Sequence, residues 1–295
     1  MKNDLLSYSR FEDRSPFFYI EHAIIEQYEK SIMIIDKEGK APIPICTIAC
    51  LLLGPGTKIT HQAILNATEA GCTVIWTGEE GVRFYASGLG ISVKSKNILL
   101  QASLFSDEEQ KLRIARKLYQ MRFNELIPEE YNLNQIRGIE GNRVRSAYKK
   151  LSEEYKIDWE GRNYDRNNWD YTNPINRAIT AANSCIYGVC TTAVISLGFS
   201  TAIGFVHSGF STAFVCDIAD LYKVSEIFPI AFATTAEGVE NLEKRVRYAC
   251  RDYFKKTKIL SRIVDNLKEV FDGCFDTGEI ISCDEGRTVE MDDTI

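Results

Sequence analysis

A change in hydrophobic period between residues 88 and 96 constrains the fold of this chain more than any other feature. Before it, short apolar runs are separated by Gly, Pro and Asp, a pattern typical of strands joined by turns; the runs are 17–20, 23–25, 31–35, 45–53, 72–76 and 82–86. A helical spacing interrupts them over 60–70 and ends at Gly71. After the change, the spacing stays helical to about residue 272. We therefore expect an α+β fold, with a β-rich, sandwich-like N-terminal domain at 1–90 and a larger all-α domain at 91–273.

Three features mark helix boundaries in the second part of the chain. Ser106 and Glu109 have the spacing of a capping box ahead of apolar positions at helical intervals. Asn173 followed by Pro174 predicts the start of a long apolar helix that ends at Gly198. The basic segment 240–260 continues the helical pattern.

The charge is distributed unevenly along the chain. The net charge is −6, but the residues from Phe271 onward hold eight acids and one arginine, a net of −7, so the rest of the chain carries +1. A near-neutral body can present a basic face, so the acidic total does not exclude DNA as a partner. The segment 274–295 has no periodicity and is expected to be an acidic, disordered tail.

Cysteine usage and hydropathy indicate a soluble cytoplasmic protein with no membrane partner. The nine cysteines are scattered without a Cys-x-x-Cys pair and the chain has only three histidines, so small buried thiols in a reducing compartment are favoured over a zinc finger. Residues 1–10 lack the apolar region of a signal peptide. The apolar stretch 175–197 includes Asn176, Arg177 and Asn183, which favours a buried helix over a membrane span. No dinucleotide or P-loop motif is present, so no nucleotide cofactor is expected.

Glu140 is unusual because it lies on the core-facing stripe of a predicted helix. Over 135–151 that stripe consists of Ile136, Val144, Ala147 and Leu151, and Glu140 falls four residues after Ile136. A carboxylate there is costly unless it is protonated, paired or bound to a metal. An ion pair with Arg137, Arg143 or Arg145 is as good an interpretation as a metal ligand.

Two aspartates and a histidine add to this picture. Asp217 and Asp220 are three residues apart on a predicted helix over 211–223, so their charges repel unless a cation lies close, although a solvated acidic face is the ordinary alternative. His207 lies in a glycine-flanked loop and carries little weight alone. Together, hard oxygen ligands and one imidazole suit Mg²⁺ or Mn²⁺, which can activate a hydroxyl and polarise a phosphate.

The chain resembles the CRISPR-associated spacer integrase, the larger subunit of the adaptation complex, and the likeness looks closest to the subtype I-E branch. Three runs carry most of it, RGIEGNRVR at 137–145, AIGFVHSG at 202–209 and FVCDIADL at 214–221. Supporting runs in the same order are GPGT at 54–57, GVRFYASG at 81–88, GRNYD at 161–165, SCIYG at 184–188 and ACRD at 249–252. The resemblance covers about residues 10–273.

This resemblance implies a site, a reaction and an assembly. It implies that Glu140, His207 and Asp220 bind one Mg²⁺ or Mn²⁺ ion, and that Asp217 is the accompanying acid. It implies transesterification, in which the 3′-hydroxyl of a captured DNA fragment attacks a phosphodiester at the border of a repeat. It further implies a homodimer formed through the β domains, and two such dimers bridged by a dimer of a small partner protein.

The same likeness suggests which residues contact double-stranded DNA. The basic candidates are Lys58, Arg83, Arg162, Lys223 and Arg247, which would position phosphates rather than read sequence. Tyr164 and Tyr187 match aromatic positions near the site, where a core tyrosine is the competing interpretation. His22 stands where close relatives have a tyrosine that stacks on the end of the duplex, and Cys216 replaces an aromatic residue.

Two other functions fit the same residues. A structure-selective endonuclease for branched DNA would use the same ion with water as the nucleophile. A non-enzymatic DNA-capture scaffold would bind DNA without turnover, although the complete ligand set argues against it.

Overall fold

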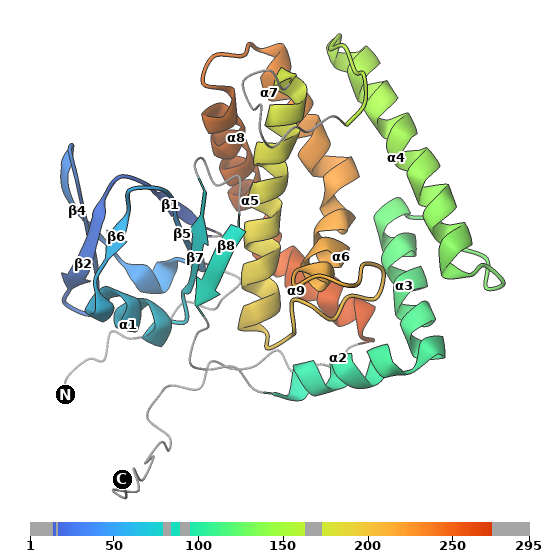
Figure 1. Ribbon diagram of the computed structural model, residues 1–295, viewed down its shortest axis with the longest axis horizontal. Coiled ribbons are helices and arrows are strands. Elements are labelled where there is room, and N and C mark those ends of the chain that lie inside the picture. Colours follow the sequence, from blue (N-terminus) through green and yellow to red (C-terminus); the bar gives the residue numbers. More distant parts are fainter. Residues whose placement is uncertain (1–13, 16, 79–83, 89–94, 163–172, 273–295) are drawn as a thin grey trace, which may run out of the picture.

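The computed structural model describes residues 14–15, 17–78, 84–88, 95–162 and 173–272. Figure 1 shows strands in the N-terminal part and helices in the rest, which confirms the predicted α+β fold. The change of period between residues 88 and 96 falls between the last strand and the first helix of the larger part. The predicted tail at 274–295 lies outside the described residues.

Two four-stranded sheets form the N-terminal part. The first has the order β1-β5-β7-β8 and comprises β1 (Phe18–Ile20), β5 (Cys50–Leu53), β7 (Thr73–Thr77) and β8 (Phe84–Gly88). The second has the order β4-β3-β2-β6 and comprises β2 (Ile24–Tyr28), β3 (Ser31–Asp36), β4 (Gly39–Ile43) and β6 (Lys58–Ile59). In the first sheet β1, β5 and β7 are parallel, and β8 is antiparallel to β7.

Apolar residues from both sheets meet in one core, which gives the sandwich-like arrangement. Ile25 and Ile32 of the second sheet share this core with Leu51 and Val74 of the first. Helix α1 (His61–Glu69) closes it, and the Thr60 hydroxyl caps the helix by accepting from the backbone of Ala63.

Several strand boundaries differ from the sequence predictions. The predicted run 45–53 is divided into a 3-10 helix, η2 (Ile45–Thr47), and strand β5. The sequence patterns do not indicate strands β4 and β6, because β4 (GKAPI) has a single large apolar residue and an internal proline, and β6 has only two residues. At the predicted turn before β4, the Asp36 carboxylate accepts from the backbone of Glu38 and Gly39.

Eight α-helices and one π-helical turn make up the described part of the larger region. They are α2 (Lys96–Ser106), α3 (Glu108–Phe123), α4 (Leu133–Tyr155), α5 (Pro174–Ser196), α6 (Ala213–Tyr222), η5 (Lys223–Ile227), α7 (Phe228–Ala236), α8 (Leu242–Lys256) and α9 (Ile259–Val270). Asn173 caps α5 and Pro174 occupies its first turn, as predicted. The predicted capping box at Ser106 is wrong: Ser106 ends α2, and Asp107 caps α3 by accepting from two backbone amides.

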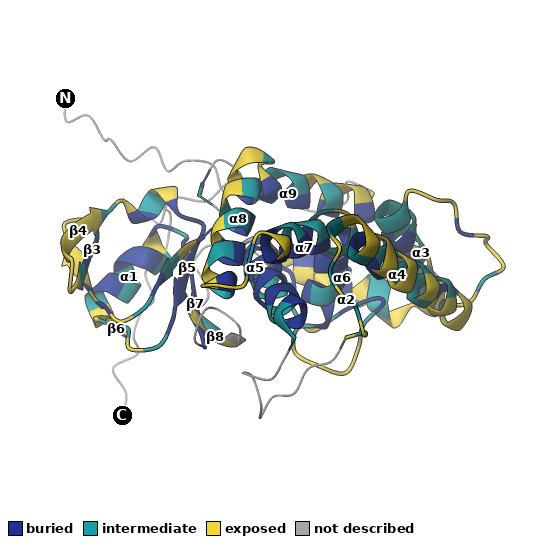
Figure 2. Cartoon of the chain, turned by 90° about the horizontal axis from the view of Figure 1, so that it is seen from above, coloured by how far each residue is buried: buried dark blue, intermediate teal, exposed yellow. Residues whose placement is uncertain are grey.

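Helix α5 lies at the centre of the molecule (Figures 1 and 2). It packs against α6, α7, α8 and α9, and it also contacts β5 and β7 of the first sheet. Leu52 and Ile75 on that face of the sheet therefore belong to the same core as Ile179 and Ile186 of α5. The sheet thus contributes one face to each of two cores.

Of the helices that the structure describes, only α5 has the length and hydropathy of a membrane span, over Pro174–Ile195. Inside the protein, 78% of its most apolar window is buried, as expected for a core helix. Seven cysteines lie in the described residues, and all are free thiols. Five of them are buried, which agrees with the prediction of small apolar side chains in the interior.

Candidate metal centre

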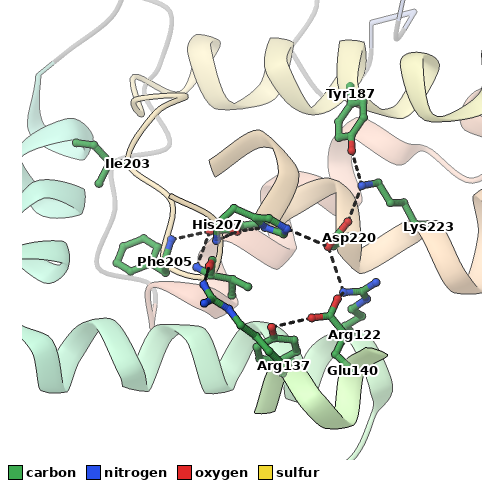
Figure 3. Close-up of polar contacts among 12 residues, drawn as sticks. Arg122, Arg137, Glu140, Tyr187, Ile203, Phe205, His207, Asp220 and Lys223 are labelled. Atoms are coloured by element: carbon green, nitrogen blue, oxygen red, sulfur yellow. Dashed lines mark hydrogen bonds and ion pairs between the residues drawn. The ribbon is translucent and has the colours of Figure 1, made fainter. Parts of the chain in front are cut away.

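Glu140, His207, Asp217 and Asp220 gather in one place from three segments of the chain (Figure 3). Glu140 projects from α4, the two aspartates from α6, and His207 from the loop between α5 and α6. His207 Nε2 lies 4.0 Å from Asp220 Oδ2. Both aspartates are buried, so the alternative of a solvated acidic face is wrong.

Asp217 holds the loop that carries His207. One of its oxygens accepts from the backbone amides of Phe205 at 2.6 Å and Val206 at 3.1 Å. The other accepts from the His207 backbone at 2.9 Å and lies 2.8 Å from His207 Nδ1. A carboxylate accepts, so Nδ1 carries the proton and Nε2 is turned toward Asp220. The hydrogen bond from His207 to Asp217 raises the pKa of His207, against the opposing effect of burial.

Gly204 is required for this loop to pass so close to α6. A Cβ on Gly204 would lie 2.4 Å from the His207 carbonyl oxygen and 2.8 Å from the carbonyl carbon of Ala213. Both neighbours are backbone atoms, so a side chain here would force the loop away from the helix. From α4, the Arg137 guanidinium donates to the Val206 carbonyl and fixes the loop from its other side.

Asp220 is held by cations on two sides. Lys223 Nζ lies 2.6 Å from Asp220 Oδ1 and 2.5 Å from the Tyr187 hydroxyl oxygen. Arg122 Nη1 lies 3.1 Å from Asp220 Oδ2. Burial alone would raise the pKa of Asp220, but Lys223 and Arg122 outweigh it and lower that pKa.

Glu140 is paired with residues of α3, which the sequence interpretation missed. The Tyr119 hydroxyl donates to Glu140 Oε2 at 2.8 Å, and the Arg122 guanidinium donates to Oε1. Burial and the neighbouring carboxylate raise the pKa of Tyr119, so the phenol remains a neutral donor.

The alternative interpretation, an ion pair of Glu140 with Arg137, Arg143 or Arg145 of its own helix, is therefore wrong in its partner. Arg137 donates to the Val206 carbonyl, Arg143 pairs with Glu125, and Arg145 donates to Asn142. A sequence feature could have indicated Arg122 instead. It follows the buried Leu118 by four residues, so it extends the core-facing stripe of α3 just as Glu140 interrupts that of α4.

The donor set fits a hard divalent cation. Glu140 and Asp220 each turn an oxygen toward the same guanidinium nitrogen, and the imidazole nitrogen of His207 faces this position (Figure 3). Among the described residues, no three His, Cys, Asp or Glu side chains stand close enough together to hold a metal ion as they lie. Arg122 separates Glu140 from Asp220, which accounts for that spacing.

The DNA-contact candidates fall into three groups. Lys58 and His22 are exposed in the β region, and the exposed Arg162 donates to Asn176 and Thr180 of α5. Lys223, Tyr187 and Arg247 are partly or fully enclosed: Lys223 is bonded to Tyr187, and the Arg247 guanidinium lies 5.2 Å from the centre of the Tyr19 ring. Arg83 and Tyr164 lie outside the described residues.

Comparison with known proteins places this chain in a family. The chain matches the family model described as CRISPR associated protein Cas1 over residues 19–127 and 120–244. It is 44% identical to the CRISPR-associated endonuclease Cas1 2 of Thermus thermophilus, across 90% of this chain and 81% of that protein. It is 38% identical to the CRISPR-associated endonuclease Cas1 of Escherichia coli K12, across 88% of this chain and 85% of that protein.

Solved structures agree with the sequence comparison. A crystal structure of a TtCas1–DNA complex has a TM-score of 0.79 at 45% identity, covering 86% of this chain and 91% of that chain. A casposase bound to its integration product has a TM-score of 0.66 over 94% of this chain and 96% of that chain, but at 13% identity it shares the fold alone. Since the family model spans more than half of the sequence and relatives match over most of their length, this chain belongs to the Cas1 family of CRISPR-associated proteins.

Proposed function

We propose that this chain is a metal-dependent DNA integrase of CRISPR adaptation. It joins the 3′-hydroxyl ends of captured foreign DNA to the repeat borders of a CRISPR array. The observation that carries the proposal is the convergence of Glu140, His207 and Asp220, from three separate segments, around one largely buried position. A relative 45% identical in sequence has been solved as a DNA complex, which supports DNA as the partner.

Glu140, His207 and Asp220 would hold the Mg²⁺ or Mn²⁺ ion. When bound, such an ion lowers the pKa of a coordinated hydroxyl and neutralises charge that develops on a phosphate. The surrounding residues keep these ligands in place: Asp217 orients the imidazole, Lys223 holds one oxygen of Asp220, and the Tyr119 hydroxyl holds one oxygen of Glu140.

The proposed reaction is a transesterification at phosphorus. The 3′-oxygen of the captured strand forms a bond to a phosphorus at the repeat border and loses its proton. The bond from that phosphorus to the 3′-oxygen of the repeat strand breaks, and this oxygen takes up a proton. The number of phosphodiester bonds is unchanged, so no covalent protein–DNA intermediate and no external energy source are needed.

We propose that exposed basic side chains position the DNA phosphates, and that the enclosed residues act within the site. Lys58 and Arg162 are exposed, so a phosphate can reach them without rearrangement of the core. Lys223 is enclosed beside Asp220, so in this proposal it acts on the bound strand only at the site itself. Arg83, Tyr164, Tyr187, Arg247 and His22 are retained as further candidates.

The proposed assembly is a homodimer formed through the β region, with two such dimers bridged by a dimer of a small partner protein. Support comes from the outer face of the second sheet, where Ile24 is 41% and Tyr28 is 43% exposed. Exposed apolar residues on a sheet face are typical of an interface. We further propose that the protein acts in the cytoplasm, and that it belongs to the subtype I-E branch.

A second candidate function is a structure-selective endonuclease for branched DNA. The relatives in Thermus thermophilus and Escherichia coli are both named endonucleases, which favours this candidate. Water would replace the 3′-hydroxyl as nucleophile, and the same side chains would serve. A non-enzymatic DNA-capture scaffold is less favoured, because it gives no reason to gather three potential ligands from separate segments around one position.

One assay separates the three functions. The protein, mixed with its small partner protein and Mn²⁺, is given a labelled 3′-hydroxyl fragment and a plasmid carrying direct repeats. Joined products migrate above the fragment and support integration, whereas only shortened products indicate hydrolysis. DNA binding without either product, in every divalent ion tried, indicates a scaffold.

The site assignment is tested in the same assay with Glu140→Gln, His207→Ala and Asp220→Asn. We expect each substitution to abolish joining, because each removes one ligand of the ion. Glu153→Gln is the matched control, since Glu153 is exposed on the same helix as Glu140. Normal joining by all three site variants would rule out this metal centre.

A further inference from the structure

We propose that Arg122 is an internal counter-cation that holds the metal position when no metal is bound, and that the divalent ion must displace its guanidinium to enter. This inference rests on the proposed metal site. It assigns to a residue of α3 a role in controlling that site, namely competition with the ion for the same two carboxylates.

The contacts of Arg122 are those that a cation between two acids would make. A single nitrogen, Nη1, donates to Glu140 Oε1 and lies 3.1 Å from Asp220 Oδ2. One positive centre therefore bridges carboxylates from α4 and α6, as Figure 3 shows. His207 Nε2 lies 4.0 Å from the same oxygen of Asp220.

The other contacts of the two carboxylates show that Arg122 is not needed to position them. The second oxygen of Glu140 accepts from the Tyr119 hydroxyl, and the second oxygen of Asp220 accepts from Lys223. Both carboxylates therefore remain fixed when the guanidinium leaves. The oxygens that Arg122 releases are the two that face the shared position, so its departure exposes a preformed pair of ligands.

One donor of the Arg122 guanidinium group is left unsatisfied in this position, although the group also lies 5.1 Å from the centre of the Phe123 ring. Its side chain is only 7% exposed, and its buried Nε has no hydrogen-bond partner in the described part of the chain. A buried donor without a partner is unfavourable, which lowers the barrier to moving the guanidinium elsewhere. Arginine also keeps its charge under all conditions, so it can leave only by moving and never by losing a proton.

Charge makes the two cations exclusive. With Arg122 and Lys223 in place, Glu140 and Asp220 are already balanced, one positive charge for each negative charge. A divalent ion added within a few ångströms of the guanidinium would repel it strongly at low effective dielectric. The ion and the guanidinium therefore cannot share the two carboxylates, and one replaces the other.

The first experiment measures Mn²⁺ affinity by electron paramagnetic resonance of the free ion. Arg122→Gln should tighten binding by at least about fivefold, because it removes the competing charge. Arg122→Lys keeps a positive charge and should bind close to wild type. The control is Arg116→Gln, since Arg116 lies on the same helix and donates to the backbone of Tyr131, away from the site. Unchanged or weaker binding in Arg122→Gln would mean that Arg122 only supports the ligands, and would overturn the inference.

The second experiment uses the wild-type protein and so does not depend on how a variant folds. Phenylglyoxal modifies accessible arginines, and mass spectrometry locates the adducts. Arg122 should be protected in chelator and become modified when Mn²⁺ is added. Arg113, whose side chain is 45% exposed, should be modified equally in both conditions. Protection of Arg122 that persists at saturating Mn²⁺ would overturn the inference.

Failure of the inference and failure of the proposed metal site give different results. If wild type binds no Mn²⁺, or if Glu140→Gln binds it as wild type does, the metal site itself is wrong. If wild type binds Mn²⁺ through Glu140 while Arg122 stays protected and Arg122→Gln has unchanged affinity, only the exchange is wrong.

Discussion

At the scale of the residue, Asp217 organises the candidate site through its hydrogen bonds. Its two oxygens accept from three consecutive backbone amides and from one imidazole nitrogen, so all of its accepting positions face the loop. The repulsion between the carboxylates of Asp217 and Asp220 is thus offset by different partners at each residue. Hydrogen bonds from backbone amides stabilise the charge of Asp217, whereas ion pairs with Arg122 and Lys223 balance the charge of Asp220.

We predict that Asp217→Asn weakens both the fold and the function. The asparagine keeps the size of the side chain but turns a donor toward backbone amides that need an acceptor, which costs about 1–3 kcal/mol of unfolding free energy. Mn²⁺ affinity should fall by roughly 10- to 100-fold, because His207 loses its orientation. Thermal melting in chelator and a Mn²⁺ titration measure the two effects. Asp265→Asn, at an exposed pair on α9, is the control. Wild-type Mn²⁺ binding by Asp217→Asn would contradict this role.

At the scale of the element, helix α3 connects the site to the end of the described chain. Tyr119 and Arg122 reach Glu140, while Arg113 and Lys117 both pair with Asp272, just beyond α9. The hydrogen bonds that Lys117 and Arg113 donate to Asp272 lower the pKa of its carboxyl group. Helix α3 therefore makes polar contacts both at the candidate site and at the end of α9.

We predict a small, pH-dependent loss of stability in Asp272→Asn. The pKa of Asp272 is lowered in the folded protein, so its stabilising effect is present above the unfolded value of about 3.9 and is lost as pH falls through the folded value. Because Asp272 is half exposed, we expect a decrease in melting temperature of only about 1–3 °C at pH 7. That difference should shrink as the pH is lowered below about 3.9. Asp252→Asn, whose partner Arg251 is its sequence neighbour, should show no difference at either pH. A pH-independent decrease would contradict the ion-pair explanation.

Local patterns predicted the elements well where the information was local. Asn173 and Pro174 begin α5 as expected, and the stripe through Ile136 and Glu140 gave the inward face of α4. Ser106 and Asp107 are adjacent and both can cap a helix, so only the hydrogen bonds show that Asp107 is the N-cap of α3.

The candidate site was less predictable, for a physical reason. The pairing of Glu140 with Arg122 joins two helices whose relative position no periodicity encodes. The amides that satisfy Asp217 come from a loop ten or more residues earlier, so the pattern along α6 does not show how Asp217 and Asp220 differ in their partners. A polar residue on an apolar stripe, such as Glu140 on α4 or Arg122 on α3, can thus be recognised from sequence, but the contact between the two helices cannot.

At the scale of the whole molecule, the two sheets serve different surroundings. The first sheet is covered on one face by α5 and on the other by the second sheet and α1. Within the part of the chain that the structure describes, the second sheet is covered on its inner face, and Ile24 and Tyr28 are exposed on the outer face. In the proposed homodimer, the outer face of the second sheet is the surface buried between the two copies.

We predict that Ile24→Asp converts the homodimer to a monomer without unfolding it. Ile24 is 41% exposed, so the charge is tolerated in the free chain but is unfavourable in a dry interface. Light scattering coupled to size-exclusion chromatography gives the mass, and circular dichroism checks the fold. Leu126→Asp is the control, because Leu126 is 91% exposed in the helical region. A dimer that survives Ile24→Asp and a second charge at Tyr28 must use another face.

The first sheet has a further consequence for how the protein is made. Strands β5 and β7 leave the ribosome well before residues 174–196, which cover Leu52 and Ile75 in the finished protein. At ordinary rates of translation the delay is roughly 5–20 s, during which this apolar surface has no intramolecular cover. Exposed surface of this kind recruits chaperones or promotes association between nascent chains. The chain is therefore most prone to aggregation during its own synthesis, before its central helix exists.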